Sequence, residues 1–201
     1  MCGRYYIEID DSELEEIVRE AEKRVKDYPG HPGQITLKTA GEIFPTDTVP
    51  VLTGVGRCEP MKWGFVNFKG RPVINARGET ALERPMFRQA MLQRRCLIPA
   101  SGYYEWRAEG RVEDRAGEGK SRKVKYRFRL PDGAMYFAGC FRQEQGSPFP
   151  HFVILTRQAS EGVAAIHDRM PVILPAAFAQ GWFHGEPDIS AAVDDLIYSA
   201  V

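Results

Sequence analysis

The stretch Val124–Phe141, VKYRFRLPDGAMYFAGCF, carries the clearest strand signal in the chain. In its first half, apolar and charged residues alternate, which is typical of a strand with one buried face. The sequence PDG then supplies a turn, and a second, almost wholly apolar run follows. We therefore predict two strands, 124–130 and 134–141, that pair with each other as a hairpin.

Further short strands are predicted on both sides of this hairpin. They lie at 41–52, 61–65, 72–76, 95–106, 151–156 and 170–174, and the run at 95–106 is divided by a Ser-Gly turn. Strands outnumber helices and the two are irregularly mixed, so a repeated βαβ array is not expected. The sequence predicts one α+β domain over residues 1–201, with a strongly twisted, partly barrel-like mixed β-sheet flanked by short helices.

Four segments are predicted to be helical. Residues 12–27 form an amphipathic pattern with a capping-box match at Ser12 and Glu15, and 84–93 carries Pro85 in its first turn. Residues 158–167 and 189–200 are predicted to form two further short helices. The segment 107–122 is polar, contains glycines and lacks apolar periodicity, so we expect a mobile surface loop there.

Composition limits the classes of function. Lysine plus arginine and aspartate plus glutamate number 27 each, so nucleic-acid binding would need a local basic patch. No apolar run approaches the ~20 residues of a membrane span, and the N-terminus lacks a signal-peptide pattern, so we expect a cytoplasmic protein without a membrane partner.

The four cysteines, Cys2, Cys58, Cys96 and Cys140, are widely spaced, with no CxxC motif and no neighbouring histidine. A metal site or a disulfide framework is therefore not expected. Cys58, Cys96 and Cys140 are predicted to be small buried side chains. No cofactor-binding motif is found, so we expect no cofactor.

Cys2 stands apart because it directly follows Met1. Removal of Met1 would give Cys2 a free α-amine beside its thiol, and this pair condenses with an aldehyde to a five-membered thiazolidine ring. An α-amine has an ordinary pKa of roughly 7.7–8.0, against about 10.4 for lysine, so much of it is unprotonated at neutral pH. Cys2 is thus a candidate nucleophile for a carbonyl substrate.

Three other polar residues could complete such a site. Glu105 lies between aromatic residues, where burial raises the pKa of a carboxyl group and suits it to move protons. Asn75 could hold the N-terminal residue, and His167 could act as an acid. Taken singly, Asn75 could instead cap a turn, Glu105 pair with an arginine, and His167 interact with a helix dipole. Sequence spacing alone does not decide whether these residues meet.

The segments MCGR, GEIFPTDTVPVL, WGF, VINARGET, RCLIPASGYYEW, FAGC and IHDRMPVIL, in this order, resemble the SOS response-associated peptidase family. Its members are also called abasic site processing proteins. The resemblance runs from Met1 to about Leu174 and implies the fold of that family. It implies covalent, reversible capture of abasic sites in single-stranded DNA, with a thiazolidine formed at Cys2 during DNA repair. Self-processing that exposes Cys2 is also implied.

The resemblance assigns roles to the same residues. Asn75 would orient the N-terminal residue, Glu105 would carry protons in formation and reversal, and His167 would assist opening of the sugar ring. Arg4 and Arg77 match phosphate-contacting positions. The expected partner is single-stranded DNA containing abasic sites, and we expect a monomer that associates with the nucleoid when it acts.

Other assignments remain open at this stage. Arg169 is a plausible further DNA contact, although all three arginines could instead form internal salt bridges. Trp63 could stack on a base or lie in the core. Lys125, Arg127 and Arg129 form a basic strand face that could be merely solvated. A cysteine peptidase acting on other proteins and a non-covalent nucleic-acid reader remain alternative functions.

Overall fold

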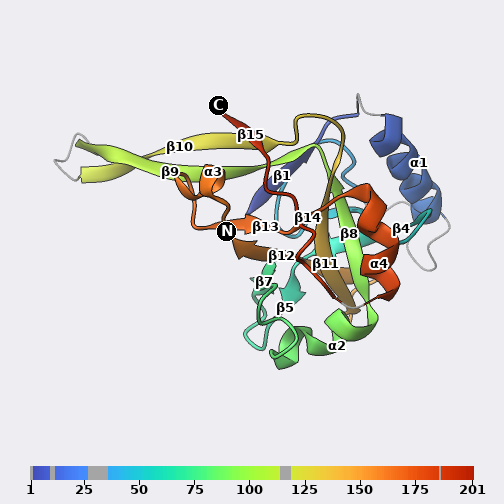
Figure 1. The fold of residues 1–201 in the computed structure, drawn as a ribbon. Helices are drawn as coiled ribbons and strands as arrows, with labels where there is room; N and C mark the ends of the chain where they lie inside the picture. Colours follow the sequence, from blue (N-terminus) through green and yellow to red (C-terminus); the bar gives the residue numbers. More distant parts are fainter. Residues whose placement is uncertain (1, 10–11, 27–35, 114–118, 186) are drawn as a thin grey trace.

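The computed structural model describes residues 2–9, 12–26, 36–113, 119–185 and 187–201 (Figure 1). The strands are β1 (Arg4–Ile7), β2 (Gly41–Ile43), β3 (Thr48–Gly54), β4 (Arg57–Trp63), β5 (Phe65–Val66), β6 (Pro72–Val73), β7 (Asn75–Arg77), β8 (Arg95–Ala100), β9 (Gly102–Glu113), β10 (Gly119–Arg129), β11 (Met135–Gln143), β12 (Pro150–Gln158), β13 (Arg169–Pro171), β14 (Ile173–Leu174) and β15 (Ile197–Ala200). The helices are α1 (Ser12–Lys26), α2 (Pro85–Gln93), α3 (Glu161–Ala164) and α4 (Ala179–His184), with a 3-10 turn η1 (Ala176–Phe178).

Two sheets organise the fold. One is antiparallel, with the order β15-β10-β9-β1-β2. In the other, the chain of neighbours β12-β4-β3-β8-β11 returns to β12, so these strands close on themselves. The remaining strands of this sheet, β7, β13 and β14, add to its rim. The predicted α+β class with a partly barrel-like sheet is confirmed.

The predicted hairpin between residues 124–130 and 134–141 is wrong. Strand β10 pairs with β9 and β15, whereas β11 pairs with β8, β12 and β14. The PDG turn is therefore a corner that takes the chain from one sheet into the other. The chain makes the same crossing in reverse between β8 and β9, so β8–β9 and β10–β11 form one long bent hairpin.

Gly102 shows how tight the crossing between β8 and β9 is. A Cβ atom at Gly102 would lie 2.2 Å from the Phe128 carbonyl oxygen and 2.4 Å from the Tyr6 hydroxyl. No other residue type fits this close approach of three strands. The Ser-Gly turn predicted within 95–106 is thus confirmed as the point where the strand changes sheet.

Three other predictions need correction. The expected loop at 107–122 is largely strand, because β9 and β10 pair as far as Glu113 and Gly119 and extend as a ribbon away from the body (Figure 1). Residues 114–118 of that prediction lie outside the described residues. The helix expected at 189–200 is instead a loop followed by β15, whose backbone pairs with the edge of β10. The helix expected at 158–167 is limited to α3.

Helices α1 and α2 agree with the sequence. Helix α1 buries Leu14, Val18 and Ala21 on one side, and α2 begins at Pro85. The side chain of Ser12, expected to cap α1, lies outside the described residues. Within the described part of the chain, no helix is long and apolar enough to cross a membrane.

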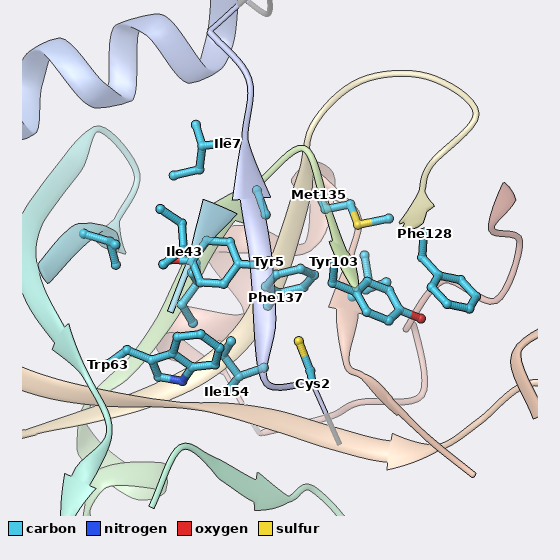
Figure 2. Close-up of a cluster of buried hydrophobic side chains, with 14 of the residues drawn as sticks. Cys2, Tyr5, Ile7, Ile43, Trp63, Tyr103, Phe128, Met135, Phe137 and Ile154 are labelled. Carbon is cyan, nitrogen blue, oxygen red and sulfur yellow. The ribbon is translucent and has the colours of Figure 1, made fainter. Parts of the chain in front are cut away.

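The main hydrophobic cluster lies beside the start of β1 (Figure 2). Trp63 stacks on Phe152, with ring centroids 6.3 Å apart, and also packs against Tyr5. The Cys2 side chain is directed into the same cluster, which includes Tyr103. Cys58, Cys96 and Cys140 are buried as predicted. The first residues of the chain are thus anchored in the core.

Candidate active site at Cys2

The four candidate residues come from four separate segments that meet where the two sheets join. Cys2 precedes β1, and β1 pairs with β9, which carries Glu105. Asn75 opens β7, and His167 lies just before β13. Strands β7 and β13 both pair with β12, on its two opposite sides. These pairings place residues distant in sequence around Cys2.

Asn75 contacts the backbone of Cys2 directly. Its side-chain Nδ2 donates a hydrogen bond of 2.9 Å to the Cys2 carbonyl oxygen. Its buried Oδ1 has no hydrogen-bond partner among the described residues. The contact fixes the N-terminal residue through its main chain, so it does not depend on the thiol.

Glu105 and His167 face each other beside Cys2. Glu105 is 3% exposed, and its Oε2 lies 3.9 Å from Nε2 of His167. Burial is the main cause that raises the pKa of the Glu105 carboxyl group, and the nearby His167 acts in the opposite direction. A carboxylate with a raised pKa accepts a proton more readily than an ordinary glutamate, which suits Glu105 to proton transfer.

The backbone determines which nitrogen of neutral His167 carries the proton. The Arg169 N–H donates to Nδ1 of His167 over 2.9 Å, and Nδ1 also lies 3.2 Å from the Arg169 carbonyl oxygen; the shorter contact favours Nδ1 as an acceptor. The proton of the neutral ring then lies on Nε2, which faces Glu105. When His167 is charged, Nδ1 can instead donate to Asp168, whose Oδ1 is 3.0 Å away. Nε2 is thus a proton donor toward the site.

The Cys2 thiol is held in its neutral form. Burial raises its pKa far above the ordinary value, and the nearby Glu105 carboxylate adds to this effect. The sulfur contacts the Arg4 carbonyl oxygen at 3.8 Å. Cysteines that act first as nucleophiles have lowered pKa values, so this environment disfavours attack by a preformed thiolate.

The three candidate DNA-binding arginines differ in their surroundings. Arg77 is exposed at the end of β7 and forms no ion pair among the described residues. The Arg4 guanidinium is half-exposed and lies 3.4 Å from Glu42. Arg169 forms a two-pronged ion pair with Glu79, at 2.7 and 2.8 Å. A phosphate at Arg169 would therefore compete with a carboxylate.

Trp63 does not fit its suggested role in base stacking. The residue is 0% exposed, and its Nε1 donates to the Ile74 carbonyl oxygen over 3.0 Å. Its large apolar ring is the reason, because the ring fills the cluster beneath β1. The structure corrects this assignment, and Trp63 instead supports the residue that precedes Asn75.

Two aromatic residues near the surface were missed by the sequence analysis. Trp106 follows Glu105 on β9 and is half-buried, with the Arg4 guanidinium 4.9 Å from its ring centroid. Phe68 is 92% exposed in the turn between β5 and β6, next to Lys69. Strand alternation next to the buried Glu105 would have placed Trp106 on the outer face. An aromatic residue in a polar turn was the available signal for Phe68.

The chain is similar to a protein-family profile and to several named proteins. The family profile described as SOS response associated peptidase (SRAP) matches residues 1–200. Abasic site processing protein YoaM of Bacillus subtilis (strain 168) is 33% identical over 155 residues, which cover 71% of this chain and 64% of YoaM. Abasic site processing protein YoqW of the same organism is 28% identical over 199 residues, which cover 92% of this chain and 80% of YoqW.

A solved structure has a similar fold. The crystal structure of a protein from Bacteroides thetaiotaomicron matches with a TM-score of 0.72 at 20% sequence identity. The match covers 100% of this chain and 92% of the other. It supports the shared architecture of the two sheets.

Proposed function

Because the chain belongs to the SOS response-associated peptidase (SRAP) family, we propose that it captures abasic sites in single-stranded DNA as a reversible thiazolidine crosslink at Cys2. Relatives of the chain are named abasic site processing proteins. The observation that carries the proposal is the hydrogen bond from Asn75 to the Cys2 carbonyl oxygen, beside Glu105 and His167. It holds the main chain of Cys2 next to two groups able to move protons.

Loss of Met1 is the first requirement, since only then does Cys2 carry a free amine. Self-processing or an ordinary aminopeptidase could remove this residue. The amine nitrogen then attacks the aldehyde carbon of the open sugar, and loss of one water gives an iminium. Glu105 suits the proton transfers of this step, because burial raises the pKa of its carboxyl group and makes it a better proton acceptor.

Ring closure by sulfur is the second step. The Cys2 sulfur bonds to the iminium carbon, the π electrons return to nitrogen, and the thiol proton passes to Glu105. Since burial keeps the thiol protonated, it does not compete with the amine for the aldehyde. An iminium left open would promote β-elimination and break the strand. Closing the ring therefore shields the abasic site.

His167 has a separate task in this scheme. An abasic sugar is mostly closed as a hemiacetal, and its ring opens when the ring oxygen receives a proton. The neutral form of His167 carries its proton on Nε2, directed toward Glu105 and the site. Only the protonated ring gives up this proton without becoming an anion, so the contact with Glu105 supports a role for protonated His167 as the acid and for the Glu105 carboxyl group in returning the proton.

The alternative of a cysteine peptidase acting on other proteins is less well supported. That chemistry needs a thiolate activated by an imidazole. Here burial raises the pKa of the thiol, and Nε2 of His167 faces Glu105. A non-covalent reader would need neither the buried carboxylate nor the hydrogen bond to Cys2.

The experiment compares three proteins on single-stranded abasic DNA in denaturing gels. Protein lacking Met1 should form a denaturation-resistant adduct without cutting the strand. Cys2→Ser keeps the amine and the main-chain contact to Asn75, so it should form an iminium that borohydride traps and that otherwise leads to strand cleavage. A protein with an uncleavable residue before Cys2 should form neither product.

Each outcome has a clear meaning. An adduct from the extended protein would contradict a role for the amine, and strand protection by Cys2→Ser would contradict ring closure by sulfur. Glu105→Gln should slow both formation and reversal of the adduct, since it removes the proton carrier at nearly constant volume. Arg88→Gln, on the exposed side of α2, provides a control with unchanged rates.

A further inference from the structure

A carboxylate outside the candidate site joins two of the segments that build it. Strands β7 and β13 lie on opposite sides of β12, and Asn75 opens the first while His167 lies just before the second (Figure 1). Glu79 follows β7, and the two terminal N–H groups of Arg169 on β13 donate to its two oxygens over 2.7 and 2.8 Å. This ion pair therefore spans β12 and links the two segments.

Strand β12 takes part in the same link. The Arg169 guanidinium also donates to the Thr156 carbonyl oxygen over 2.7 Å, and Glu79 Oε1 accepts from the Gln158 N–H over 3.1 Å. Only 11% of the Arg169 side chain is exposed. Arg169 is the first residue of β13, and its own N–H is directed to His167 and not to β12. The side-chain contacts thus add to strand pairing in fixing this end of the strand.

Arg169 contacts the candidate site through its main chain. Its N–H donates to Nδ1 of His167 over 2.9 Å, and its carbonyl oxygen lies 3.2 Å from the same nitrogen. A neutral ring can accept from the N–H, whereas a charged ring can donate to the carbonyl oxygen or to Asp168 Oδ1, which is 3.0 Å away. The ring can therefore gain or lose a proton on Nδ1 while Nε2 stays directed at Glu105.

The charges around this ring come from three segments. Glu105 on β9 faces Nε2 at 3.9 Å, and Asp168 faces Nδ1. The Arg169 cation is paired with Glu79, and the hydrogen bonds from Arg169 lower the pKa of Glu79 to about 2. Glu79 is therefore ionised at neutral pH and keeps Arg169 in place whether His167 is neutral or charged.

We propose that Glu79 is a positioning residue: by holding Arg169, it fixes the imidazole of His167 with Nε2 toward the site. The inference rests on the proposed function for the step that His167 serves, which is opening of the closed sugar ring. It requires no contact of Glu79 with DNA. Glu79→Gln sets an amide donor against one N–H of Arg169, so it breaks one of the two hydrogen bonds at nearly constant volume and leaves the cation in place.

Two substrates isolate the step on which Glu79 acts. One is single-stranded DNA with an ordinary abasic site, whose sugar is mostly closed. The other carries an aldehyde at the same place and lacks the hydroxyl that closes the ring, so it needs no ring opening. At saturating DNA, Glu79→Gln should slow adduct formation on the closed sugar roughly 10- to 100-fold, because misplacing a reacting group by about 1 Å can cost on the order of 100-fold. On the open aldehyde its rate should equal that of the parent protein.

A combined variant tests whether the effect passes through His167. His167→Gln should slow reaction of the closed sugar by roughly 100-fold or more, as expected for loss of a general acid. Adding Glu79→Gln to this variant should have no further effect, because the ring that Glu79 orients is gone. Glu59→Gln is the matched control and should leave all rates unchanged, since it breaks an ion pair of 2.9 Å with Arg24 between β4 and α1.

The orientation of the ring can be measured without any reaction. A histidine ring is mostly neutral at about pH 8.5, and the ¹⁵N chemical shifts of its two nitrogens then report which of them carries the proton. In DNA-free protein with labelled histidine, the parent and Glu59→Gln should show His167 with its proton on Nε2. In Glu79→Gln the two shifts should move toward those of a mixture of both tautomers. The spectrum of His167→Gln assigns the signals.

The outcomes separate this inference from the proposed function. It is supported if Glu79→Gln slows reaction of the closed sugar alone, adds nothing to His167→Gln, and shifts the ring signals. It is overturned if the two substrates are slowed equally or not at all, if the effects of the two substitutions multiply, or if the ring signals match those of the parent. If protein lacking Met1 forms no adduct with either substrate, the proposed function fails, and the ring signals alone support or overturn the inference.

Discussion

Two tryptophans provide a direct test of the assignment of core and DNA-binding residues, because they are chemically identical and differ in burial. Trp63 is 0% exposed within the main cluster, whereas Trp106 is half-buried on the outer face. We predict that Trp63→Ala lowers stability and leaves the intrinsic affinity of the folded protein for DNA unchanged. Trp106→Ala should have the opposite effects.

The magnitude for Trp63 follows from its contacts. Truncation of a fully buried tryptophan to alanine costs about 3–5 kcal/mol of unfolding free energy, mainly through the cavity that remains. The lost hydrogen bond from Nε1 adds little, because the Ile74 carbonyl oxygen still accepts from the Ile154 N–H over 3.1 Å. For a chain of this size, about 2–4 °C in Tm corresponds to each kcal/mol, so Tm should fall by roughly 6–20 °C.

For Trp106 the two effects reverse. A half-exposed side chain on a sheet face contributes little cavity energy, so we expect a change in unfolding free energy below about 1 kcal/mol. Loss of its ring should weaken binding of single-stranded DNA by roughly 5- to 100-fold. The Arg4 guanidinium would also lose one of the two rings between which it lies.

The assay is thermal melting by circular dichroism, combined with fluorescence polarisation on undamaged single-stranded DNA at a temperature where every variant is folded. Trp63→Phe keeps most of the volume and provides a variant that folds if Trp63→Ala does not. The reasoning is refuted if Trp63→Ala melts like the parent protein and binds DNA as weakly as Trp106→Ala.

Three further predictions concern stability. Arg95→Met should lower Tm far more than Arg94→Met, its control at the exposed neighbouring position. The reason is that the buried Arg95 guanidinium donates to carbonyl oxygens at the ends of α2 and α4. Equal melting temperatures of the two variants would contradict this. The ion pair with Arg169 lowers the pKa of Glu79 to about 2, so its contribution is present above pH ~4.5 and is lost as pH falls toward 2. Screening of this 43% exposed carboxylate limits the effect to about 1 kcal/mol, and Glu79→Gln should reduce the shift of the urea midpoint between pH 5 and 3. Burial lowers the pKa of His151, so stability should fall as the pH drops below the ordinary histidine pKa of about 6.5. In His151→Gln, the urea midpoint should therefore change less between pH 7.5 and 5.5.

How much of the fold could be predicted depended on whether the signal was local. Alternation in 124–130 identified a strand with one buried face, and β10 buries Phe128 as expected. This alternation did not identify the strand that pairs with β10. Strands β8 and β11 are both fully or mostly apolar, so the pattern alone does not distinguish them as partners. The close approach at Gly102, where β8 passes into β9 beside Phe128 of β10, is a tertiary contact that the local pattern does not contain.

The errors at 107–122 and 197–200 have a common physical reason. The sequence of the β9–β10 ribbon is polar and shows no apolar period, and the ribbon forms through backbone pairing of the two strands. Strand β15 is stabilised by the backbone edge of β10 and by Tyr198, whose ring lies 5.3 Å from that of Phe128. Both elements form through partners distant in sequence, which a local pattern does not contain.

The site was predictable in its residue types and not in its geometry. Cys2, Asn75, Glu105 and His167 were selected by chemistry and by resemblance, while their meeting depends on β1 pairing with β9 and on β12 pairing with both β7 and β13. Sequence reasoning also could not separate Trp63 from Trp106, because both occur in short aromatic strands. Burial distinguishes them, and burial is decided by the tertiary fold.

The position of the candidate site where the two sheets join agrees with the order of steps in the proposed reaction. The same burial that raises the pKa of the Glu105 carboxyl group raises that of the Cys2 thiol, since both charged forms are poorly solvated there. An α-amine behaves differently, because burial favours its neutral, nucleophilic form. In the proposed reaction, one low-dielectric environment would therefore favour the amine as the first nucleophile, keep the sulfur protonated until the iminium has formed, and supply a carboxyl group to accept the thiol proton when the ring closes.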